Sequence, residues 1–287
     1  MTSRVVVTGG SGKLGRAVVA DLAANGYEVF NVDRVGAPGA AVRLDLTDFG
    51  QAVEALSGIE DRYASVDAVV HLAAVPAPGL IANAETFRHN ITATHNVFAA
   101  ARLAGVRNVV WASSETLLGL PFDTLPPPHF PVDEAFDARP QSSYSLAKHL
   151  EEQMAAQFCR WDPALKMIGL RFSNVMAPED YADFPGYSAD PRLRSWNAWG
   201  YIDARDGAQA VRLALESDIV GMEVFVIANA DTVMTQPSAS LAAEVFPDVP
   251  FTRPVEGTET LLSIDKARRM LGYEPRFGWR AGVVSTE

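Results

Sequence analysis

The sequence predicts an α/β fold in which a doubly wound parallel sheet carries helices on both faces and a small C-terminal lobe is appended. Apolar runs rich in β-branched residues alternate with longer helical patterns along residues 1–173, as in folds built from repeated strand and helix units. These runs are hydrophobic almost throughout, which is typical of strands that are covered on both faces. A glycine-rich turn follows the first run and opens the first helix.

Each predicted strand is a short apolar run, and a helix follows most of them. The expected strands are "RVVVT", "EVFNVD", a short strand that ends at Asp45, "DAVVHLA", "NVVWAS" and "KMIGLRF". The expected helices cover residues 13–25, 48–57, 84–104 and 142–160. This regular order predicts a parallel sheet whose crossovers are helices.

Beyond residue 173 the pattern loosens into "SNVMAPEDYADFPGYSADPRLRSWNAWG", which we interpret as a substrate-binding segment because compact domains seldom carry long irregular loops without a function. Four further elements complete the lobe: a helix near 204–216, a strand at 223–228, a helix near 236–245 and a capped helix from Ser263 to Gly272. Residues 174–287 are therefore expected to form mainly a substrate-binding lobe, with some segments returning to the sheet.

A proline-rich segment, "GLPFDTLPPPHFPVDEAFDARP", separates the fifth predicted strand from the helix at 142–160. Its prolines exclude a helix or a central strand, since proline lacks the backbone N–H that both require. Residues 119–140 are thus a loop, either a rigid surface connector or a segment that closes over a substrate.

The composition is that of an ordinary globular protein, with 48% hydrophobic and 21% charged residues. A net charge of −11 argues against nucleic acid or an anionic membrane as a partner and favours a small molecule. The single cysteine, Cys159, predicts a reducing compartment and a packed thiol, and no metal site is expected. Without an apolar leader or a run of membrane-spanning length, we expect a cytoplasmic protein.

The stretch "VVVTGGSGKLGRAV" places Gly9, Gly12 and Gly15 in the spacing G-x-x-G-x-x-G between a strand and a helix. Glycines at such a turn let backbone N–H groups approach a pyrophosphate at the helix N-terminus. Residues 1–173 are therefore predicted to form a dinucleotide-binding Rossmann domain.

Three charged residues follow the glycine turn at the second and third strands. Asp33 ends "EVFNVD", where an acidic side chain meets the ribose hydroxyls and favours NAD over NADP. Arg34 is able to stack on the adenine or to pair with a 2'-phosphate, so NADP stays open as an alternative. Asp45 is placed either to accept from the adenine amino group or to cap the next helix.

The stretch "YSLAKHLEE" carries a tyrosine and a lysine four positions apart in a predicted helix, so Tyr144 and Lys148 share one face. A lysine ammonium beside the phenol is expected to pull the pKa of Tyr144 from about 10 toward neutrality. Such a tyrosine is a proton-transfer group next to a nicotinamide.

These motifs together resemble the extended short-chain dehydrogenase/reductase family, the NAD-dependent epimerase/dehydratase group. The resemblance rests on blocks that occur in family order over nearly the whole chain: "TGGSGKLG", "HLAA", "HNITATHNVFAAA", "WASSETLLG", "YSLAK", "LRFSNVMAP", "YIDARDGAQA" and "SIDKARRMLGYEP".

The resemblance implies an enzyme with a Ser-Tyr-Lys triad made of Ser114, Tyr144 and Lys148, with Ser113 a structural neighbour. It implies that Asn90 supports the site, or only ties backbone together, and that Asn174 lies near the nicotinamide or the substrate. Cofactor contacts are implied for the glycine turn, the acidic and basic residues above, the triad and further positions: Gly9, Gly12, Lys13, Leu14, Gly15, Asp33, Arg34, Asp45, Leu46, Leu72, Ala73, Ala74, Asn90, Tyr144, Lys148 and Asn174.

Glu115 follows Ser114, where dehydratases of the family resemble T-D-E. Because Thr116 stands at the second carboxylate position, sugar dehydration is not expected. Glu115 either binds a substrate hydroxyl or faces solvent.

The substrate residues depart from the nucleotide-sugar members of the family. Arg253 in "FTRPVEGTE" resembles a diphosphate-binding arginine, but Trp199 and Leu118 stand where an arginine and a tyrosine are usual. The loop "APEDY…PRLRSW" is similar to that of short uronate dehydrogenases, in which Arg192 or Arg194 would bind a substrate carboxylate, unless both are only solvated.

The predicted function is thus NAD-dependent oxidoreduction or epimerisation at a secondary alcohol or ketone of a sugar-like substrate. Nucleotide-sugar 4-epimerisation and sugar-acid oxidation are the enzymatic alternatives, and a dinucleotide-sensing regulator is the non-enzymatic one. By the same resemblance, the helices at 84–104 and 142–160 would form a homodimer interface.

Overall fold

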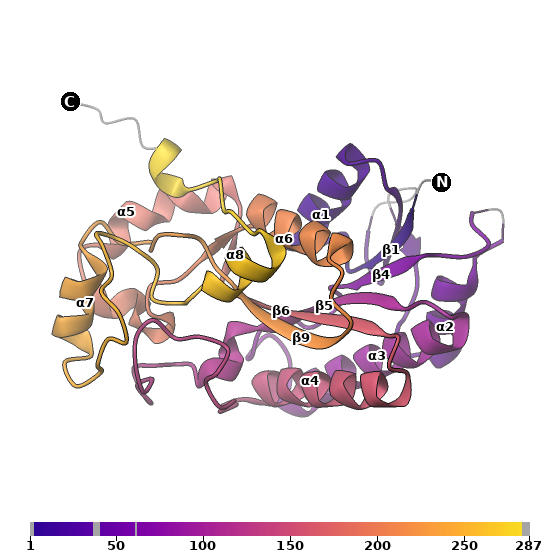
Figure 1. The fold of residues 1–287 in the computed structure, drawn as a ribbon, viewed down its shortest axis with the longest axis horizontal. Coiled ribbons are helices and arrows are strands. Elements are labelled where there is room, and N and C mark those ends of the chain that lie inside the picture. The colour runs from indigo at the N-terminus through magenta and orange to yellow at the C-terminus, as the bar shows by residue number, and fades with distance from the viewer. Residues whose placement is uncertain (1–2, 37–40, 61, 283–287) are drawn as a thin grey trace.

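The computed structural model describes residues 3–36, 41–60 and 62–282 and has a seven-stranded sheet at its centre (Figure 1). The strands lie in the order β3-β2-β1-β4-β5-β6-β9, and every neighbouring pair is parallel. Their bounds are β1 Arg4–Thr8, β2 Glu28–Asp33, β3 Val42–Arg43, β4 Ala68–His71, β5 Asn108–Ser114, β6 Lys166–Phe172 and β9 Gly221–Ile227. The order reverses between β1 and β4, which makes the sheet doubly wound as predicted.

Helices cover both faces of the sheet (Figure 1). One face carries α1 (Lys13–Ala24) and α6 (Ala204–Glu216), which pack on each other. The other carries α2 (Phe49–Ser57), α3 (Asn83–Ala104) and α4 (Ser143–Trp161), packed side by side. The residues of β1 alternate between these layers, because successive strand side chains point to opposite faces: Val5 and Val7 join the core under α1, and Val6 joins the core over α3.

Short elements beyond β6 build the lobe beside the carboxyl ends of the strands. They are β7 (Val175–Met176), η2 (Pro178–Asp183), α5 (Phe184–Tyr187), η3 (Pro191–Asn197), β8 (Ile202–Asp203) and α7 (Ser238–Val245). The segment predicted to be irregular therefore contains single helical turns. The helix expected to complete the lobe, α8 (Asp265–Leu271), instead packs against β9 and α6. The strand predicted at 223–228 is β9, which belongs to the main sheet. The helix predicted at 204–216 is α6, which packs on that sheet.

The proline-rich loop 119–140 is exposed at residues 123–126, while its buried residues pack against the lobe. Leu120, Phe122 and Phe130 are buried in the same core as the lobe. Phe122 N donates to Trp196 O at 2.8 Å, and Phe130 N donates to Pro250 O at 2.9 Å. The loop is thus a packed layer that joins the end of β5 to the substrate side of the molecule.

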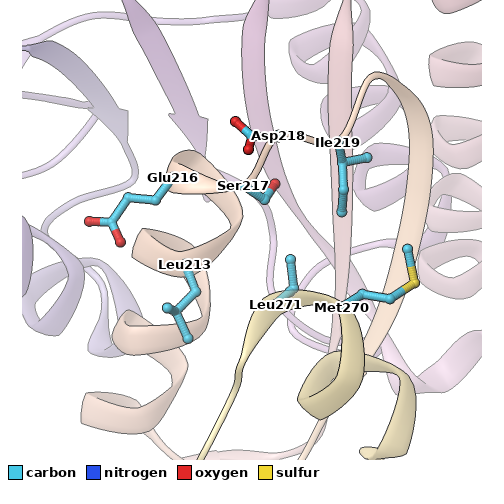
Figure 2. A pocket seen from close by; sticks show the side chains of 7 residues that line it. All are labelled: Leu213, Glu216, Ser217, Asp218, Ile219, Met270 and Leu271. Atoms are coloured by element: carbon cyan, nitrogen blue, oxygen red, sulfur yellow. The ribbon is translucent and has the colours of Figure 1, made fainter.

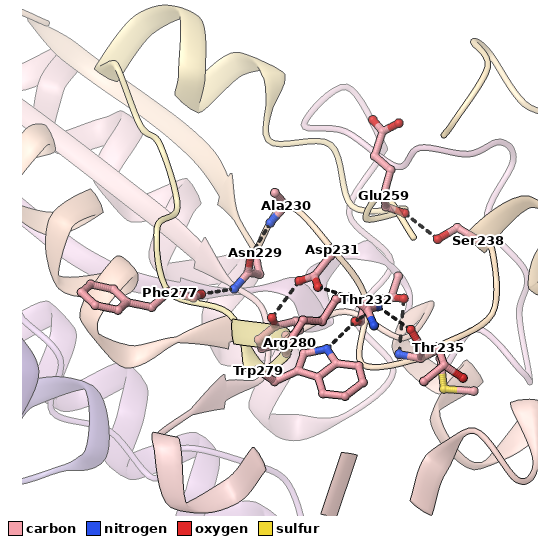
Figure 3. A network of polar contacts seen from close by, with 12 residues as sticks. Asn229, Ala230, Asp231, Thr232, Thr235, Ser238, Glu259, Phe277, Trp279 and Arg280 are labelled. Atoms are coloured by element: carbon pink, nitrogen blue, oxygen red, sulfur yellow. Dashed lines mark hydrogen bonds and ion pairs between the residues drawn. The ribbon is translucent and has the colours of Figure 1, made fainter. Parts of the chain in front are cut away.

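Residues 277–282 form a strap that ties the lobe to the sheet (Figure 3). Arg280 Nε lies 2.7 Å from Asp231 Oδ2, and Trp279 Nε1 donates to Thr232 O at 2.9 Å. Asn229 Nδ2 donates to Phe277 O at 2.6 Å. The strap, which includes η4 (Trp279–Gly282), therefore fixes the loop after β9 against the lobe.

One predicted helix start is wrong. The helix expected from Ser263 begins at Asp265 and its N-cap residue is Ile264, with Ser263 Oγ accepting only from Asp265 N at 3.4 Å. Its end is as predicted, because Gly272 has φ +69°, a conformation that glycine adopts without strain. Among the described residues, none of the helices combines the length and apolarity needed to cross a membrane.

Candidate active site

The glycine turn lies at the carboxyl ends of β1 and β4 and leaves no room for side chains. Gly9 has φ +71°, and a Cβ there would lie 2.6 Å from Ala73 N. A Cβ on Gly15 would lie 2.2 Å from Gly9 O. Only glycine fits at both positions, so the turn presents bare backbone at the start of α1. This cradle fits the pyrophosphate of a dinucleotide.

Asp33 lies beside this turn at the end of β2. Its Oδ2 accepts from Ser11 N at 3.0 Å, and its Oδ1 accepts from Val35 N at 3.2 Å. The carboxylate is therefore fixed next to the glycine turn, where the adenosine ribose of a dinucleotide would lie. Arg34 is exposed, and its Nη1 lies 3.4 Å from His89 Nε2.

Asp45 is not the cap of the next helix, so that alternative is wrong. The N-cap of α2 is Asp48, whose side chain accepts from Gln51 N. One oxygen of Asp45 accepts from both Thr47 N at 2.9 Å and Thr47 Oγ1 at 2.8 Å. These hydrogen bonds lower the pKa of Asp45 and keep it a charged acceptor.

The remaining predicted cofactor residues differ in where their side chains point. Lys13 Nζ lies 2.6 Å from Asp180 Oδ2, so it links the glycine turn to η2. Leu14 packs against α6, since its Cδ1 is 2.8 Å from where a Cβ of Gly207 would lie. Leu46 is buried in the core, and the half-buried run after β4 comprises Leu72, Ala73 and Ala74. Ala73 N donates to Thr8 Oγ1 at 3.3 Å.

Asn90 ties backbone together, the second of its two predicted roles. Its Oδ1 accepts from Val75 N at 2.8 Å, and its Nδ2 donates to Val75 O at 3.0 Å. The residue is fully buried. It therefore holds the loop that carries Ala73 and Ala74 at the edge of the sheet.

The predicted triad residues lie together at the end of β5. Ser114 is the last residue of β5, while Tyr144 and Lys148 lie one helical turn apart on α4, and all three are buried. A hydrogen bond from Ser114 favours the ionised form of Tyr144. Ser114 Oγ also accepts from Thr116 Oγ1 at 2.9 Å.

The sequence predicted a lowered pKa for Tyr144, but the folded protein raises it. Burial raises the pKa of the phenol above its ordinary value of 10 and outweighs the lowering by Lys148 and Ser114. Glu151 and Glu115 raise it further through their charges. The prediction omitted these two buried carboxylates and the cost of burying a phenolate.

Lys148 is held by two acceptors. Its Nζ donates to Ala112 O at 2.8 Å and to Glu151 Oε2 at 2.9 Å. Ser113 is structural as expected, because it donates to Glu152 Oε1 at 2.6 Å in a buried group with Arg171.

Glu115 is buried, so the prediction that it might face solvent is wrong. Its Oε2 accepts from Ser173 Oγ at 2.6 Å, and its Oε1 accepts from Asn197 Nδ2 at 3.1 Å. Burial raises the pKa of Glu115 to about 7, although the hydrogen bonds from Ser173 and Asn197 and the charge of Arg194 oppose the rise. A group that gains and loses a proton near neutral pH therefore follows Ser114 directly.

Arg194 completes this buried polar group, which we call the Glu115 box: Glu115, Ser173, Asn174, Arg194 and Asn197. With the Asn174 amide oriented so that its oxygen faces the guanidinium, that oxygen accepts from Nη1 and Nη2 at 3.2 Å. Arg194 Nη2 donates to Gly200 O at 3.2 Å, and its guanidinium stacks over Tyr187 and Trp196. Among residues 3–36, 41–60 and 62–282, no carboxylate lies within ion-pair distance of the Arg194 guanidinium.

The other two predicted arginines are not part of this box. Arg192 is exposed on η3. Arg253 Nη2 lies 2.7 Å from Glu259 Oε1 and 3.4 Å from Asp265 Oδ2, so its charge is already compensated. Trp199 is fully buried and donates to Pro191 O at 2.7 Å, which makes it a packing residue.

Sequence reasoning missed three residues that contact the predicted site: Ser173, Asn197 and Glu151. The sequence spacing could have indicated Glu151, because it is three positions after Lys148 and so lies on the same helix face. No spacing indicated Ser173 and Asn197, since only the folded chain brings η3 and the end of β6 to Glu115.

A surface pocket lies between the C-terminal end of α6 and α8 (Figure 2). Its lining consists of Leu213, Glu216, Ser217, Asp218, Ile219, Met270 and Leu271. This end of α6 leads into Gly221, which pairs with the first residue of β6. The pocket is therefore at the opposite edge of the sheet from Ser114. Within the described chain, no group of three or more His, Cys, Asp or Glu side chains could hold a metal ion.

The fold and the glycine turn define a dinucleotide-binding α/β protein, and the family follows from comparison. Residues 5–228 match the model of the NAD dependent epimerase/dehydratase family, so the chain belongs to that family. NAD is accordingly the cofactor, in agreement with the glycine cradle and Asp33.

Relatives are UDP-glucose 4-epimerases. The Bos taurus enzyme is 30% identical over 196 residues, which cover 61% of this chain and 54% of that enzyme, so the match spans about half of the relative's length. UDP-glucose 4-epimerase 3 of Oryza sativa subsp. japonica is 24% identical, and the match covers 96% of this chain and 86% of that enzyme.

Solved structures share the fold. MoeE5 in complex with UDP-glucose and NAD has a TM-score of 0.70 and 25% identity, covering 98% of this chain and 96% of that chain. A mutated uronate dehydrogenase has a TM-score of 0.67 and 22% identity, covering 100% of this chain and 88% of that chain.

Proposed function

We propose that this protein is an NAD-dependent oxidoreductase that acts on a secondary alcohol of a small, sugar-like substrate carrying an anionic group. Ser114, Tyr144 and Lys148 perform the proton transfer, and Arg194 binds the anion. The buried guanidinium of Arg194, which lacks an ion-pair partner in the described chain, is the observation that carries the proposal.

Tyr144 is the acid/base of the reaction. Its phenolate removes the hydroxyl proton as the carbon–oxygen single bond becomes a carbonyl, and Ser114 donates a hydrogen bond to the reacting oxygen. NAD, when held by the glycine turn, would supply the acceptor for the hydride that leaves the same carbon. Lys148 stabilises the phenolate, and its contact with Ala112 O anchors it between α4 and β5. Reduction of the carbonyl runs through the same steps in reverse.

The cofactor is held by the glycine turn and Asp33. Gly9, Gly12 and Gly15 give the pyrophosphate access to backbone N–H groups at the start of α1. Asp33 accepts from the ribose hydroxyls, and Asp45 is placed to accept from the adenine amino group.

Arg194 supports an anionic substrate because its buried guanidinium has no carboxylate within ion-pair distance in the described chain, and the charge of Glu115 compensates the cost of burial only in part. Desolvation lowers the pKa of Arg194, and an incoming carboxylate would offset that cost through paired, charge-assisted hydrogen bonds. Glu115 lies in the same box and directly after Ser114, so the anion would sit beside the reacting centre. A hexuronic acid carries the required negative charge together with secondary alcohols, and mutated uronate dehydrogenase shares this fold.

Nucleotide-sugar 4-epimerisation is the second candidate, favoured by the UDP-glucose 4-epimerases among the relatives. Against it, Arg253 is neutralised by Glu259 and Asp265, and Trp199 is packed in the core. In that reaction Arg194 would bind a phosphate of the nucleotide.

A substrate panel tests the proposal. The protein with NAD is incubated with glucuronate, galacturonate, glucose, galactose, UDP-glucose and UDP-galactose, while NADH absorbance is followed and sugars are separated afterwards. We expect net NADH formation with a hexuronic acid. Interconversion of the UDP-sugars without net NADH would instead establish the epimerase, and turnover of neither class together with NAD binding would favour the dinucleotide-sensing regulator.

We also propose a homodimer through α3 and α4. These helices pack side by side and expose Leu103, Leu146 and Trp161, which are 69%, 41% and 49% accessible. Analytical ultracentrifugation should give twice the chain mass, and a monomer would contradict the proposal. The cytoplasmic location stays a prediction from the sequence.

A further inference from the structure

The buried ion pair between Lys148 and Glu151 opposes the role that the proposed function gives to Lys148. A lysine that stabilises a phenolate acts through its positive charge. Here Lys148 Nζ lies 2.9 Å from Glu151 Oε2, and their side chains are only 3% and 0% exposed. The chain thus places a carboxylate against the lysine, in a region that water does not screen.

Glu151 is held by Lys148, which donates to its Oε2 at 2.9 Å. Burial raises the pKa of Glu151, while Lys148 and Thr94 favour its charged form. A separate buried polar chain links Thr94 of α3 to the end of β1: the Thr94 hydroxyl lies 3.1 Å from His71 Nε2, and His71 Nδ1 lies 2.7 Å from Thr8 Oγ1.

We propose that Glu151 is a positioning residue that sets the proton affinity of Tyr144 by anchoring Lys148 and neutralising part of its charge. This inference rests on the proposed function, because it takes Tyr144 as the acid/base. With Glu151 present, the phenol keeps its proton to a higher pH than Lys148 alone would allow.

Other charged groups face the same site, and their effects are distinguishable. Glu115 of η1 also raises the pKa of Tyr144. Glu152 of α4 pairs with Arg171 of β6 at 2.8 Å, which compensates its charge. His71 of β4 is neutral near pH 7, since burial and the charge of Lys148 lower its pKa to about 3. Glu151 is the carboxylate in direct contact with the lysine.

Ultraviolet titration of the NAD-loaded protein tests this inference without any substrate. The phenolate band is followed against pH for the wild type and Glu151→Gln, and the same proteins carrying Tyr144→Phe are subtracted to isolate Tyr144 from the other six tyrosines. We expect Glu151→Gln to lower the midpoint by about one pH unit, as removal of a close carboxylate should. Glu244→Gln on the exposed side of α7 is the control and should leave the midpoint unchanged.

Glu151→Asp is the second variant, which keeps the charge but moves it away from the lysine. Its midpoint should fall between those of the wild type and Glu151→Gln. An unchanged midpoint in either folded variant would overturn the inference. A shifted midpoint without turnover of any panel substrate would support the inference and contradict the proposed function, so the two failures are distinguishable.

Discussion

The proposed cofactor side and the proposed substrate side of this site differ in what forms them: backbone on one side and buried polar side chains on the other. On the cofactor side, backbone at Gly9, Gly12 and Gly15 forms the cradle within seven consecutive residues. On the substrate side, the Glu115 box joins side chains from η1, the end of β6 and η3. The first depends on the absence of side chains and the second on buried polar contacts between distant segments. Substitutions on the two sides should therefore have separable effects.

The largest effect is expected at Tyr144, which lies between the two sides. Tyr144→Phe removes the proton acceptor and should lower kcat at least ~1,000-fold, since a positioned acid/base contributes roughly 100- to 10,000-fold. Initial rates of NADH formation measure the loss. NAD affinity, followed by calorimetry, should stay within about twofold. A rate within tenfold of the wild type would exclude Tyr144 as the acid/base.

The cofactor side should be disrupted by Gly9→Ala. The added Cβ would lie 2.6 Å from Ala73 N, and φ is +71°, so strain of roughly 1–3 kcal/mol should weaken NAD binding about 10- to 100-fold. Gly26→Ala is the matched control, because Gly26 has φ +86° and nothing within 4 Å. That variant should lose stability alone. Equal losses of NAD affinity in both variants would show that backbone strain, not the cradle, is responsible.

Glu115, on the proposed substrate side, should make the free energy of unfolding depend on pH. Burial raises the pKa of Glu115 from 4.5 to about 7, so the folded state binds a proton that the unfolded state has released in this range. The contribution of Glu115 to the free energy of unfolding should therefore fall as the pH rises from about 4.5 to 7, by at most ~3 kcal/mol. Denaturant melts of Glu115→Gln should show a smaller fall than the wild type, since Asp206, with a pKa raised to about 6, contributes to the fall in every variant. Glu244→Gln should retain the full wild-type fall. Parallel curves for all three proteins would show that Glu115 does not titrate there.

The smallest effect is expected at Asp33, where the comparison is between two cofactors. Asp33→Asn removes the charge that repels a 2'-phosphate and should reduce the preference for NAD over NADP about tenfold. Binding of each cofactor is measured by calorimetry. Asp45→Asn, farther along the adenosine site, should leave the ratio unchanged. If both variants keep the wild-type ratio, another group, such as Arg34, sets the preference.

The sequence predicted the fold and the NAD cofactor, because both depend on local patterns. The predicted strand "EVFNVD" is β2 and the helix predicted at 204–216 is α6, since strand and helix periodicity is visible in a single window. The glycine spacing likewise specifies its own turn. The start of α8 was misplaced by two residues, because a serine suited to capping stands just before it.

The contacts of the proposed substrate side could not be predicted from the sequence, because they join residues far apart in the chain. Glu115 and Asn197 are 82 positions apart, and no periodicity connects them. Arg192 and Arg194 look alike in the sequence, yet only Arg194 is buried in the box. The pKa of Tyr144 was misjudged for the same reason, since the burial of the phenol and the nearby charges of Glu151 and Glu115 arise only on folding.

The most direct test of the division between the two sides is the substrate selectivity of Arg194→Gln. The measured quantity is kcat/KM for a hexuronate divided by kcat/KM for the matching neutral hexose, in the wild type, Arg194→Gln and the exposed control Arg192→Gln. Loss of a charge-assisted pair costs roughly 2–5 kcal/mol, so the ratio should fall at least ~30-fold in Arg194→Gln, with NAD affinity unchanged, and hold in Arg192→Gln. A ratio that survives in Arg194→Gln, or that falls equally in Arg192→Gln, would contradict Arg194 as the anion-binding residue.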